Sequence, residues 1–345
     1  MASAASTSPS QHAAFLATQT VADVLKAKTT EHPLIDIHVS ATVEKVFETL
    51  LSNDILSVPV YRIFNNVKDY VAIIDTYDLL SSMAERGFEV ESGSSPDTEF
   101  LSMPVAILVG MTKSSSKLWT CLSSLPLPQL FELFTKHRVH RILVLEEIPV
   151  RWDEVDQEEA EAKPRQQPNG RLVSQTDVIR FLLEHNHQLG SILDTTAEQT
   201  AGHALRYAQE YLDTAAAVQL KQTPASITIN CVAWTALQTM STSQASCVAI
   251  VDSNGALVAE MSAADLRGLN PDRIQDLNRP VLVYLKTCQG KGNVKQPLSC
   301  RTKFTLGQVL SGLVRSHGHR SWLVDEENRP IGCITLSDVL SLFSE

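Results

Sequence analysis

One local pattern occurs four times along the chain: an apolar segment ends at a small polar residue, and an aspartate follows three positions later. The four segments read DYVAIIDTYDLL, GRLVSQTDVIRFL, ALVAEMSAADLRGL and RPIGCITLSDVLSL. Each predicts a strand followed by a helix, because the polar residue can cap the helix and the aspartate falls in its first turn. A repeat of this kind constrains the fold more than composition does, since neighbouring units must pack together.

A second apolar segment precedes each of these, and the four read SVPVYR, HRILVLE, SCVAIVD and HRSWLVD. Their spacing to the aspartate is equal in the third and fourth units, 18 residues from Cys247 to Asp265 and from Arg320 to Asp338. The second unit is longer, and its excess at 146–170 is polar, acidic and proline-bearing. We interpret this excess as a solvated hairpin loop, with an acidic docking site as the alternative.

An amphipathic helix is predicted before the paired strands of each unit. In the first unit a core-facing stripe is formed by Val43, Val46, Phe47, Leu50 and Leu51. In the fourth unit Thr305 and Gln308 form a capping-box pair. A unit of roughly 50–60 residues buries too little apolar surface to be stable alone. We therefore expect an α/β (α+β) chain whose four units associate in two pairs.

Composition narrows the function. The chain of 345 residues is 43% hydrophobic with a formal net charge of -10, which favours a globular protein and disfavours bulk nucleic-acid binding. Its six cysteines form no CxxC pair, so we expect reduced thiols, and the histidines form no credible metal set. With no signal peptide or membrane span evident, we expect no membrane partner and a location in the cytoplasm, with the nucleus as a second compartment.

Four sequence segments resemble those of a known family: KHRVHRILV at 136–144, HGHRSWLVD at 317–325, SAADLRG at 262–268 and SSKLWTCLSS at 115–124. With the repeat plan, they make the chain resemble CBS-domain proteins, in which β-α-β-β-α repeats pair into Bateman modules. Four such motifs resemble the γ regulatory subunit of AMP-activated and sucrose-non-fermenting-related protein kinases, in the plant-type branch. The resemblance implies a pseudo-symmetric disc, AMP, ADP or ATP as regulatory ligand without a cofactor, and kinase catalytic and β-type subunits as partners.

The expected division of the chain follows the repeats. A disordered tail (1–18) is followed by motif 1 (19–90), motif 2 (91–188), a linker with helical character (189–215), motif 3 (216–275) and motif 4 (276–345).

The same resemblance implies the site residues. The terminal aspartates would accept hydrogen bonds from the ribose hydroxyls, as a carboxylate suits two neighbouring donors; they are Asp78, Asp177, Asp265 and Asp338. The phosphates would meet His-Arg pairs at the start of a strand, namely His140, Arg141, His319 and Arg320. The cleft would be lined by Ser174, Ser262 and Thr335.

Three departures from the family pattern reduce the expected phosphate contacts. Asp75 adds a carboxylate near Asp78, Leu56 replaces an arginine, and Thr176 replaces a lysine. They motivate an alternative, a CBS scaffold that assembles partners without responding to nucleotide. An enzyme is a third hypothesis, but the repeats leave no space for a catalytic domain of about 100 residues. The chain also lacks P-loop, GxSxG, HExxH and kinase signatures, so we expect no enzymatic activity.

Overall fold

The computed structural model describes residues 10–28, 33–86, 99–145, 170–212, 224–288 and 293–344. Within these residues each of the four repeats forms one three-stranded sheet. In every sheet the first strand runs parallel to the middle strand, and the third strand runs antiparallel to it. The predicted α/β fold with four CBS-type repeats is confirmed.

The elements of the four repeats follow one order. Repeat 1 contains β1 (Ile37–His38), α3 (Val43–Ser52), β2 (Ser57–Phe64), β3 (Val67–Asp75) and α4 (Thr76–Glu85). Repeat 2 contains β4 (Thr120–Leu122), α6 (Leu127–His137), β5 (Arg141–Leu145), β6 (Arg171–Ser174) and α8 (Gln175–Glu184). Repeat 3 contains β7 (Ser226–Thr228), α11 (Ala233–Thr242), β8 (Cys247–Val251), β9 (Leu257–Ser262) and the 3₁₀ helix η5 (Ala263–Leu266). Repeat 4 contains β10 (Ser299–Cys300), α13 (Leu306–Ser316), β11 (Arg320–Val324), β12 (Pro330–Thr335) and α14 (Leu336–Ser341).

A left-handed residue turns the chain from helix to strand in every repeat. It lies three positions before the middle strand, at Asp54, Arg138, Gln244 and His317, with φ values of 50°, 54°, 50° and 50°. A side chain in this region is costly, so its recurrence without glycine shows that tertiary packing enforces the turn. The turn places the residues at the start of the middle strand, where the His-Arg pairs occur.

Each repeat also receives a segment from outside its own sheet. Isolated β-bridges join Thr42 to Pro104, Thr20 to Pro126, Val232 to Pro280 and Thr196 to Thr305. They bring η1 (Val105–Leu108) to repeat 1, α2 (Val21–Lys26) to repeat 2, α12 (Val281–Cys288) to repeat 3 and α9 (Ala197–Tyr211) to repeat 4. The remaining short elements are α1 (Gln11–Leu16), α5 (Glu99–Ser102), η3 (Asn186–Gln188), η4 (Gly190–Asp194) and η6 (Ile274–Asn278).

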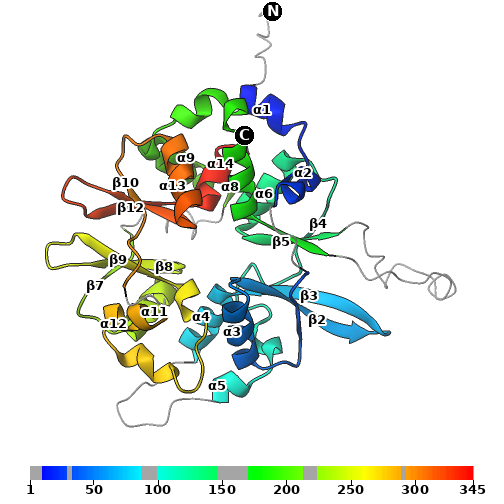
Figure 1. The fold of residues 1–345 in the computed structure, drawn as a ribbon, viewed down its shortest axis with the longest axis vertical. Helices are drawn as coiled ribbons and strands as arrows, with labels where there is room; N and C mark the ends of the chain where they lie inside the picture. The colour runs from blue at the N-terminus through cyan, green and yellow to red at the C-terminus, as the bar shows by residue number, and fades with distance from the viewer. Residues whose placement is uncertain are drawn as a thin grey trace, which may run out of the picture.

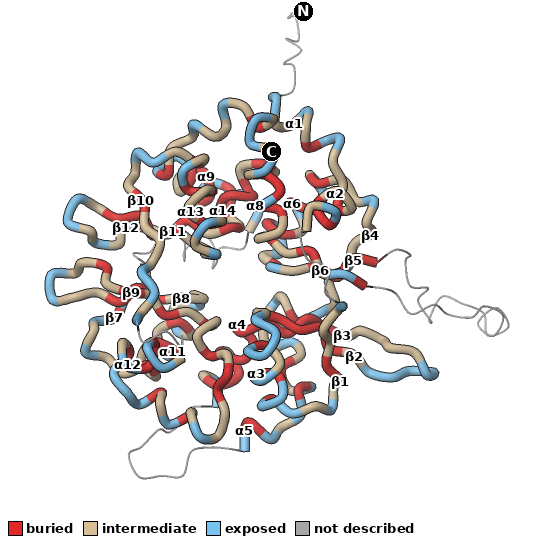
Figure 2. Tube along the Cα trace, in the orientation of Figure 1, coloured by how far each residue is buried: buried red, intermediate tan, exposed pale blue. Residues whose placement is uncertain are grey.

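Four apolar clusters hold the repeats around a common centre (Figure 1). One large cluster joins residues of repeats 1 and 3, and the other joins repeats 2 and 4. Two small clusters lie between sheets: Ile73 meets Leu143 between repeats 1 and 2, and Ala249 meets Trp322 between repeats 3 and 4. The exposed residues collect at the outer hairpins, including the tip of β2–β3 (Figure 2).

Three expectations need correction. The tail was predicted to be disordered, yet Gln11–Leu16 form α1, because Leu16 is buried and Phe15 stacks on Phe181. The helical character of the linker is confirmed, but α9 packs on repeat 4 through Thr196 and buried Tyr207.

The predicted stripe of α3 is correct at four positions, whereas Leu51 is 49% exposed and leans toward Gly268. The helix predicted after the third repeat is only a 3₁₀ turn, ended before Gly268, whose φ is +76°. The acidic loop at 146–170 lies outside the described residues except for Gly170.

Candidate functional site

The four repeat aspartates all cap their own helix starts. Each Oδ2 accepts a hydrogen bond from the backbone amide three residues earlier, at 2.7–2.8 Å. In the second, third and fourth repeats the hydroxyl of Ser174, Ser262 or Thr335 also donates to that oxygen. The predicted cleft-lining hydroxyls therefore serve the cap. This arrangement leaves Oδ1 as the carboxylate oxygen available to another donor.

Asp78 already has donors for that second oxygen. Thr112 and Ser115 donate to Asp78 Oδ1 at 2.7 and 2.6 Å, and Asp78 is 0% exposed. Burial, followed by the neighbouring Asp75 carboxylate, raises the pKa of Asp78 to about 8. The chain's own turn thus occupies the position predicted for a ribose, so this geometry disfavours a nucleotide at the first repeat.

Asp177 is paired with a residue near the start of the chain. Lys28 Nζ lies 2.9 Å from Asp177 Oδ2 and also donates to the backbone carbonyl of Leu172 at 2.7 Å. The two side chains are largely shielded from water, which reduces screening of the pair. A ligand at the second repeat would have to accept or displace this lysine.

Asp338 keeps one carboxylate oxygen outside the cap. The amide and the hydroxyl of Thr335 donate to Oδ2, and within the part of the chain that the structure describes Oδ1 accepts no hydrogen bond. Asp338 is 7% exposed; burial raises its pKa, while the Thr335 cap and the nearby Arg138 guanidinium oppose that rise. In the third repeat, Tyr284 Oη donates to the backbone carbonyl of Asp265 at 2.9 Å and fixes the turn. Asp338 is therefore a clearer candidate for a ligand contact than Asp78 or Asp177.

The two predicted His-Arg pairs come together between repeats 2 and 4. Burial lowers the pKa of His319 to about 3, and the cations that contribute further are Arg141, Arg320, His140 and Lys295. Thr176 Oγ1 lies 3.5 Å from His319 Nδ1. The fold thus brings the other three predicted phosphate ligands, His140, Arg141 and Arg320, near the neutral imidazole of His319.

Nearby carboxylates reduce the net positive charge around the two His-Arg pairs. His140 Nδ1 lies 3.5 Å from Asp75 Oδ2. Burial alone would raise the pKa of Asp75, but His140, Arg141 and the Tyr77 amide outweigh it and lower that pKa. Arg141 also lies near Asp177. Asp75 therefore takes up positive charge that a phosphate would otherwise meet, while the predicted repulsion of a nucleotide at Asp78 stays a prediction.

Arg320 lies at the contact between the sheets of repeats 3 and 4. Its Nη2 donates to Ser246 Oγ at 3.3 Å, and Glu260 and Asp265 are nearby carboxylates. Its buried Nε has no hydrogen-bond partner in the described structure. An unpaired donor on a buried guanidinium is costly, so Arg320 is suited to receive an anionic oxygen.

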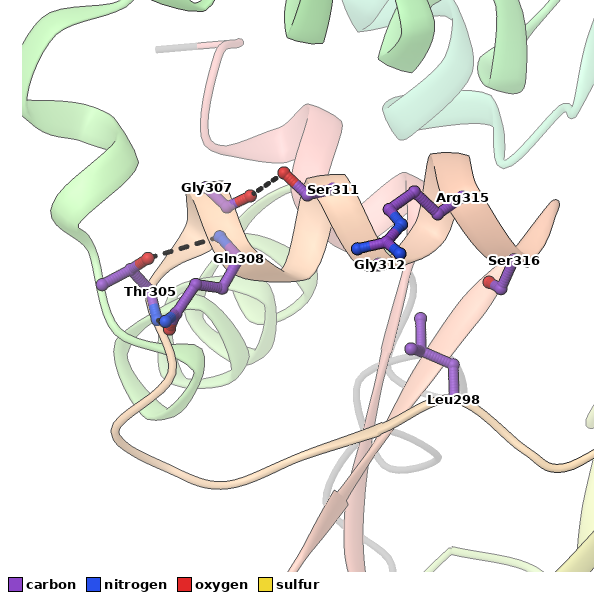
Figure 3. Close-up of a pocket in the computed structure, with 8 residues that line it drawn as sticks. All are labelled: Leu298, Thr305, Gly307, Gln308, Ser311, Gly312, Arg315 and Ser316. Atoms are coloured by element: carbon purple, nitrogen blue, oxygen red, sulfur yellow. Dashed lines mark hydrogen bonds between the residues drawn. The ribbon is translucent and has the colours of Figure 1, made fainter.

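A separate groove of about 760 Å³ runs along α13 (Figure 3). Gly307, Ser311 and Gly312 line it, and Arg315 extends over it from the last turn of the helix. The Thr305–Gln308 capping box predicted from sequence closes one end and is confirmed. None of the predicted ligand residues lines this groove, so it is not the predicted nucleotide site.

Metal binding and membrane spanning can both be judged from the described residues. Among the described residues no group of three or more histidine, cysteine, aspartate or glutamate side chains is placed to hold a metal ion. Within the same ranges no helix has both the length and the apolar character needed to cross a membrane.

Sequence reasoning missed the partners of the aspartates. Lys28 contacts Asp177, and Thr112 and Ser115 contact Asp78; they carried no motif, because these contacts join positions far apart in the sequence. Arg138 had a detectable signal, its place beside the His140–Arg141 pair, and it lies near Asp338. The two other basic residues near the motifs act elsewhere: Arg62 pairs with Asp69 at 2.7 Å, and Arg315 lines the α13 groove.

Comparison with known proteins agrees with this architecture. Residues 293–345, the fourth repeat, match the family model described as CBS domain. The match identifies a CBS domain in the fourth repeat, and the other three repeats have the same three-stranded sheet order.

The similarity also extends over nearly the whole chain, which resembles γ-type regulatory subunits. SNF1-related protein kinase regulatory subunit gamma-like PV42a from Arabidopsis thaliana is 22% identical over 344 residues, covering 89% of this chain and 90% of the relative. Its paralogue PV42b is 21% identical over 298 residues, covering 80% and 76%. The crystal structure of protein MJ1225 from Methanocaldococcus jannaschii, proposed as an archaeal homologue of g-AMPK, superposes with a TM-score of 0.63 at 18% identity, covering 94% of this chain and all of that one.

Proposed function

We propose that this chain is a regulatory subunit of γ type that binds an adenine nucleotide at the centre of its four repeats. The single observation that carries the proposal is the convergence of His140, Arg141, His319 and Arg320 from two separate repeats. Polyphosphates need several donors held in place, and an acidic chain of net charge -10 can offer positive charge only locally, here through Arg141 and Arg320. Asp338, at the start of α14, supplies the acceptor for ribose hydroxyls.

The kinase partner is part of the same proposal. Its support is the similarity to two proteins named as gamma-like regulatory subunits of SNF1-related kinase, over most of this chain. A nucleotide contacting repeats 2 and 4 together would shift how these repeats pack, provided that it binds the two packings with different affinities. The partners would be kinase catalytic and β-type subunits in the cytoplasm.

A scaffold without nucleotide response is the second candidate function. Two observations favour it. The hydroxyls of Thr112 and Ser115 donate to the carboxylate of Asp78, and Lys28 forms an ion pair with Asp177. On that reading the remaining cations hold the repeats together and bind no ligand. The scaffold predicts intact partner binding with no measurable nucleotide affinity.

Calorimetric titration separates the two. AMP and ATP are titrated into the purified full chain, with Asp338→Asn and Arg141→Gln beside it and Arg62→Gln as a matched control on the outer hairpin. A charged hydrogen bond in a buried site is worth about 1.5–3 kcal/mol, so each site variant should lose roughly tenfold or more in affinity. If neither nucleotide gives a binding signal with a folded wild-type sample, the proposal is refuted and the scaffold function remains.

The proposal also includes the absence of enzymatic activity. Nucleotide turnover by the purified chain is measured by product formation over several hours. Turnover that disappears in Asp338→Asn would contradict a purely regulatory role.

A further inference from the structure

Two cysteines from different repeats meet where the sheets of repeats 3 and 4 pack together. Cys247 begins β8, and Cys333 lies within β12. Both pack against the small cluster of Ala249, Leu257, Trp322 and Val324 that joins these sheets. The six cysteines are all free thiols, and the common contacts of these two place them as neighbours at the contact between the two sheets.

The surroundings make the two thiols unequal. The neighbouring Cys333 thiol, followed by the positive charge of Arg320, lowers the pKa of Cys247 although burial opposes the change. The pKa of Cys333 is raised, first by the neighbouring Cys247 and then by burial. The thiolate is the reactive form of cysteine, so Cys247 is the nucleophile of the pair and Cys333 its neighbour.

We propose that Cys247 and Cys333 form a reversible oxidation site in which hydrogen peroxide converts the two thiols into a disulfide linking repeats 3 and 4. Cys247 sulfur attacks one peroxide oxygen, the O–O bond breaks, and a sulfenic acid and one water result. Cys333 sulfur then attacks the Cys247 sulfur, and the sulfenic oxygen leaves as a second water. The two thiols lose two electrons in total, and one peroxide is reduced to two waters.

The position of this pair gives the cross-link a structural consequence. Cys247 follows Ser246, whose hydroxyl accepts a hydrogen bond from Arg320 Nη2 at 3.3 Å. A covalent link between β8 and β12 would fix the two sheets at the place where Arg320 is held. Oxidation would therefore lock the contact between repeats 3 and 4, whether or not a nucleotide binds.

Peptide mapping tests the proposal without any nucleotide, so it fails or succeeds independently of the proposed function. The full chain is treated with hydrogen peroxide, remaining thiols are alkylated, and non-reduced peptides are analysed by mass spectrometry. We expect a peptide joining Cys247 to Cys333 that disappears on reduction. Cys231→Ser is the matched control, because Cys231 can share a peptide with Cys247; it should keep the cross-link.

Single variants complete the test. Cys247→Ser and Cys333→Ser should each abolish the cross-linked peptide, and Cys247→Ala and Cys333→Ala repeat the measurement should a serine variant fail to fold. In the wild type, two of the six thiols should become resistant to alkylation and recover with dithiothreitol. A cross-link that survives Cys247→Ser, or oxidation that leaves all six thiols alkylated, would overturn the proposal.

Discussion

The Ser115 hydroxyl donates a hydrogen bond of 2.6 Å to Asp78 Oδ1, across 37 positions of sequence. Thr112 donates to the same oxygen at 2.7 Å, so two neighbouring hydroxyls meet one carboxylate. A ribose presents its cis hydroxyls in the same chemical form, as two donors to a bidentate acceptor. The first repeat thus satisfies its aspartate from within the chain, and several measurable consequences follow from this one contact.

Ser115→Ala should destabilise the protein by about 1–3 kcal/mol, because it leaves a buried carboxylate with one donor fewer. The free energy of unfolding is measured by urea denaturation. Ser116→Ala is the matched control, since Ser116 is exposed and donates only to the Lys113 carbonyl. Equal stability of the Ser115 and Ser116 variants would show that the contact with Asp78 contributes nothing.

The titration of Asp78 should contribute to the pH dependence of the free energy of unfolding. Its folded-state pKa is raised to about 8, above the ordinary value, so the folded state holds the proton more tightly than the unfolded state. The stability from this group is present below about pH 4 and is lost as the pH rises to about 8. Asp78→Asn removes the titration, whatever its effect on absolute stability.

The measurement is the difference in unfolding free energy between wild type and Asp78→Asn across that range. This difference cancels the titrating groups that do not interact with Asp78, including His319, whose lowered pKa acts in the opposite direction. We expect wild type to lose stability relative to the variant as the pH rises. A difference that stays constant from pH 4 to 8 would contradict a raised pKa at Asp78.

Lys28→Met should destabilise the chain by about 1–2 kcal/mol. The substitution keeps the aliphatic length but removes the ion pair with Asp177 and the hydrogen bond to the Leu172 carbonyl, both of which are partly buried. Lys26→Met, two positions earlier, removes only an exposed pair with Asp23 at 3.5 Å and should change stability by less than about 0.5 kcal/mol. Thermal unfolding of the two variants in parallel tests this contrast, which would fail if both shifted equally.

The repeats could be predicted because their signals are local. Strands of apolar residues, a capping residue and an aspartate three positions later all lie within about a dozen residues, and the structure confirms the four sheets that follow from them. The Thr305–Gln308 capping box is a similar case. Leu51 shows the limit, since a helical period cannot tell the edge of a stripe from its centre.

The contacts that decide the site could not be predicted, because they join distant positions. Ser115 and Asp78 meet only when the segment that follows η1 packs against the start of α4, and Lys28 reaches Asp177 only through the placement of α2. The partition of the core is equally non-local: the large clusters join repeats 1 with 3 and 2 with 4, not the sequential pairs. A repeat pattern predicts which face of each unit is buried, but it does not predict which other unit packs against that face.

His319 and Arg141 should differ sharply in their effect on nucleotide affinity. His319 has a pKa near 3, so at neutral pH it offers the phosphate a hydrogen bond but no charge. Arg141 remains charged and can contact phosphate through several donors. Under the proposed function, His319→Gln should weaken AMP binding only a few-fold, whereas Arg141→Gln should weaken it about tenfold or more. Calorimetry at two salt concentrations tests the ranking, and an equal loss in the two variants would show that His319 is charged when ligand is bound.

The number of nucleotides bound should not depend on Asp78. Its carboxylate is fully buried and accepts hydrogen bonds from Asp75, Thr112 and Ser115, so no oxygen faces a ligand. Asp338 has only its Oδ2 engaged by the Thr335 cap in the described structure. We therefore expect Asp78→Asn to keep the wild-type stoichiometry and affinity in a folded sample, while Asp338→Asn loses a site or weakens it at least tenfold. A site lost in Asp78→Asn would mean that the Thr112–Ser115 turn opens to admit a nucleotide, and that the hydroxyls seen on Asp78 are a closed state of a working site.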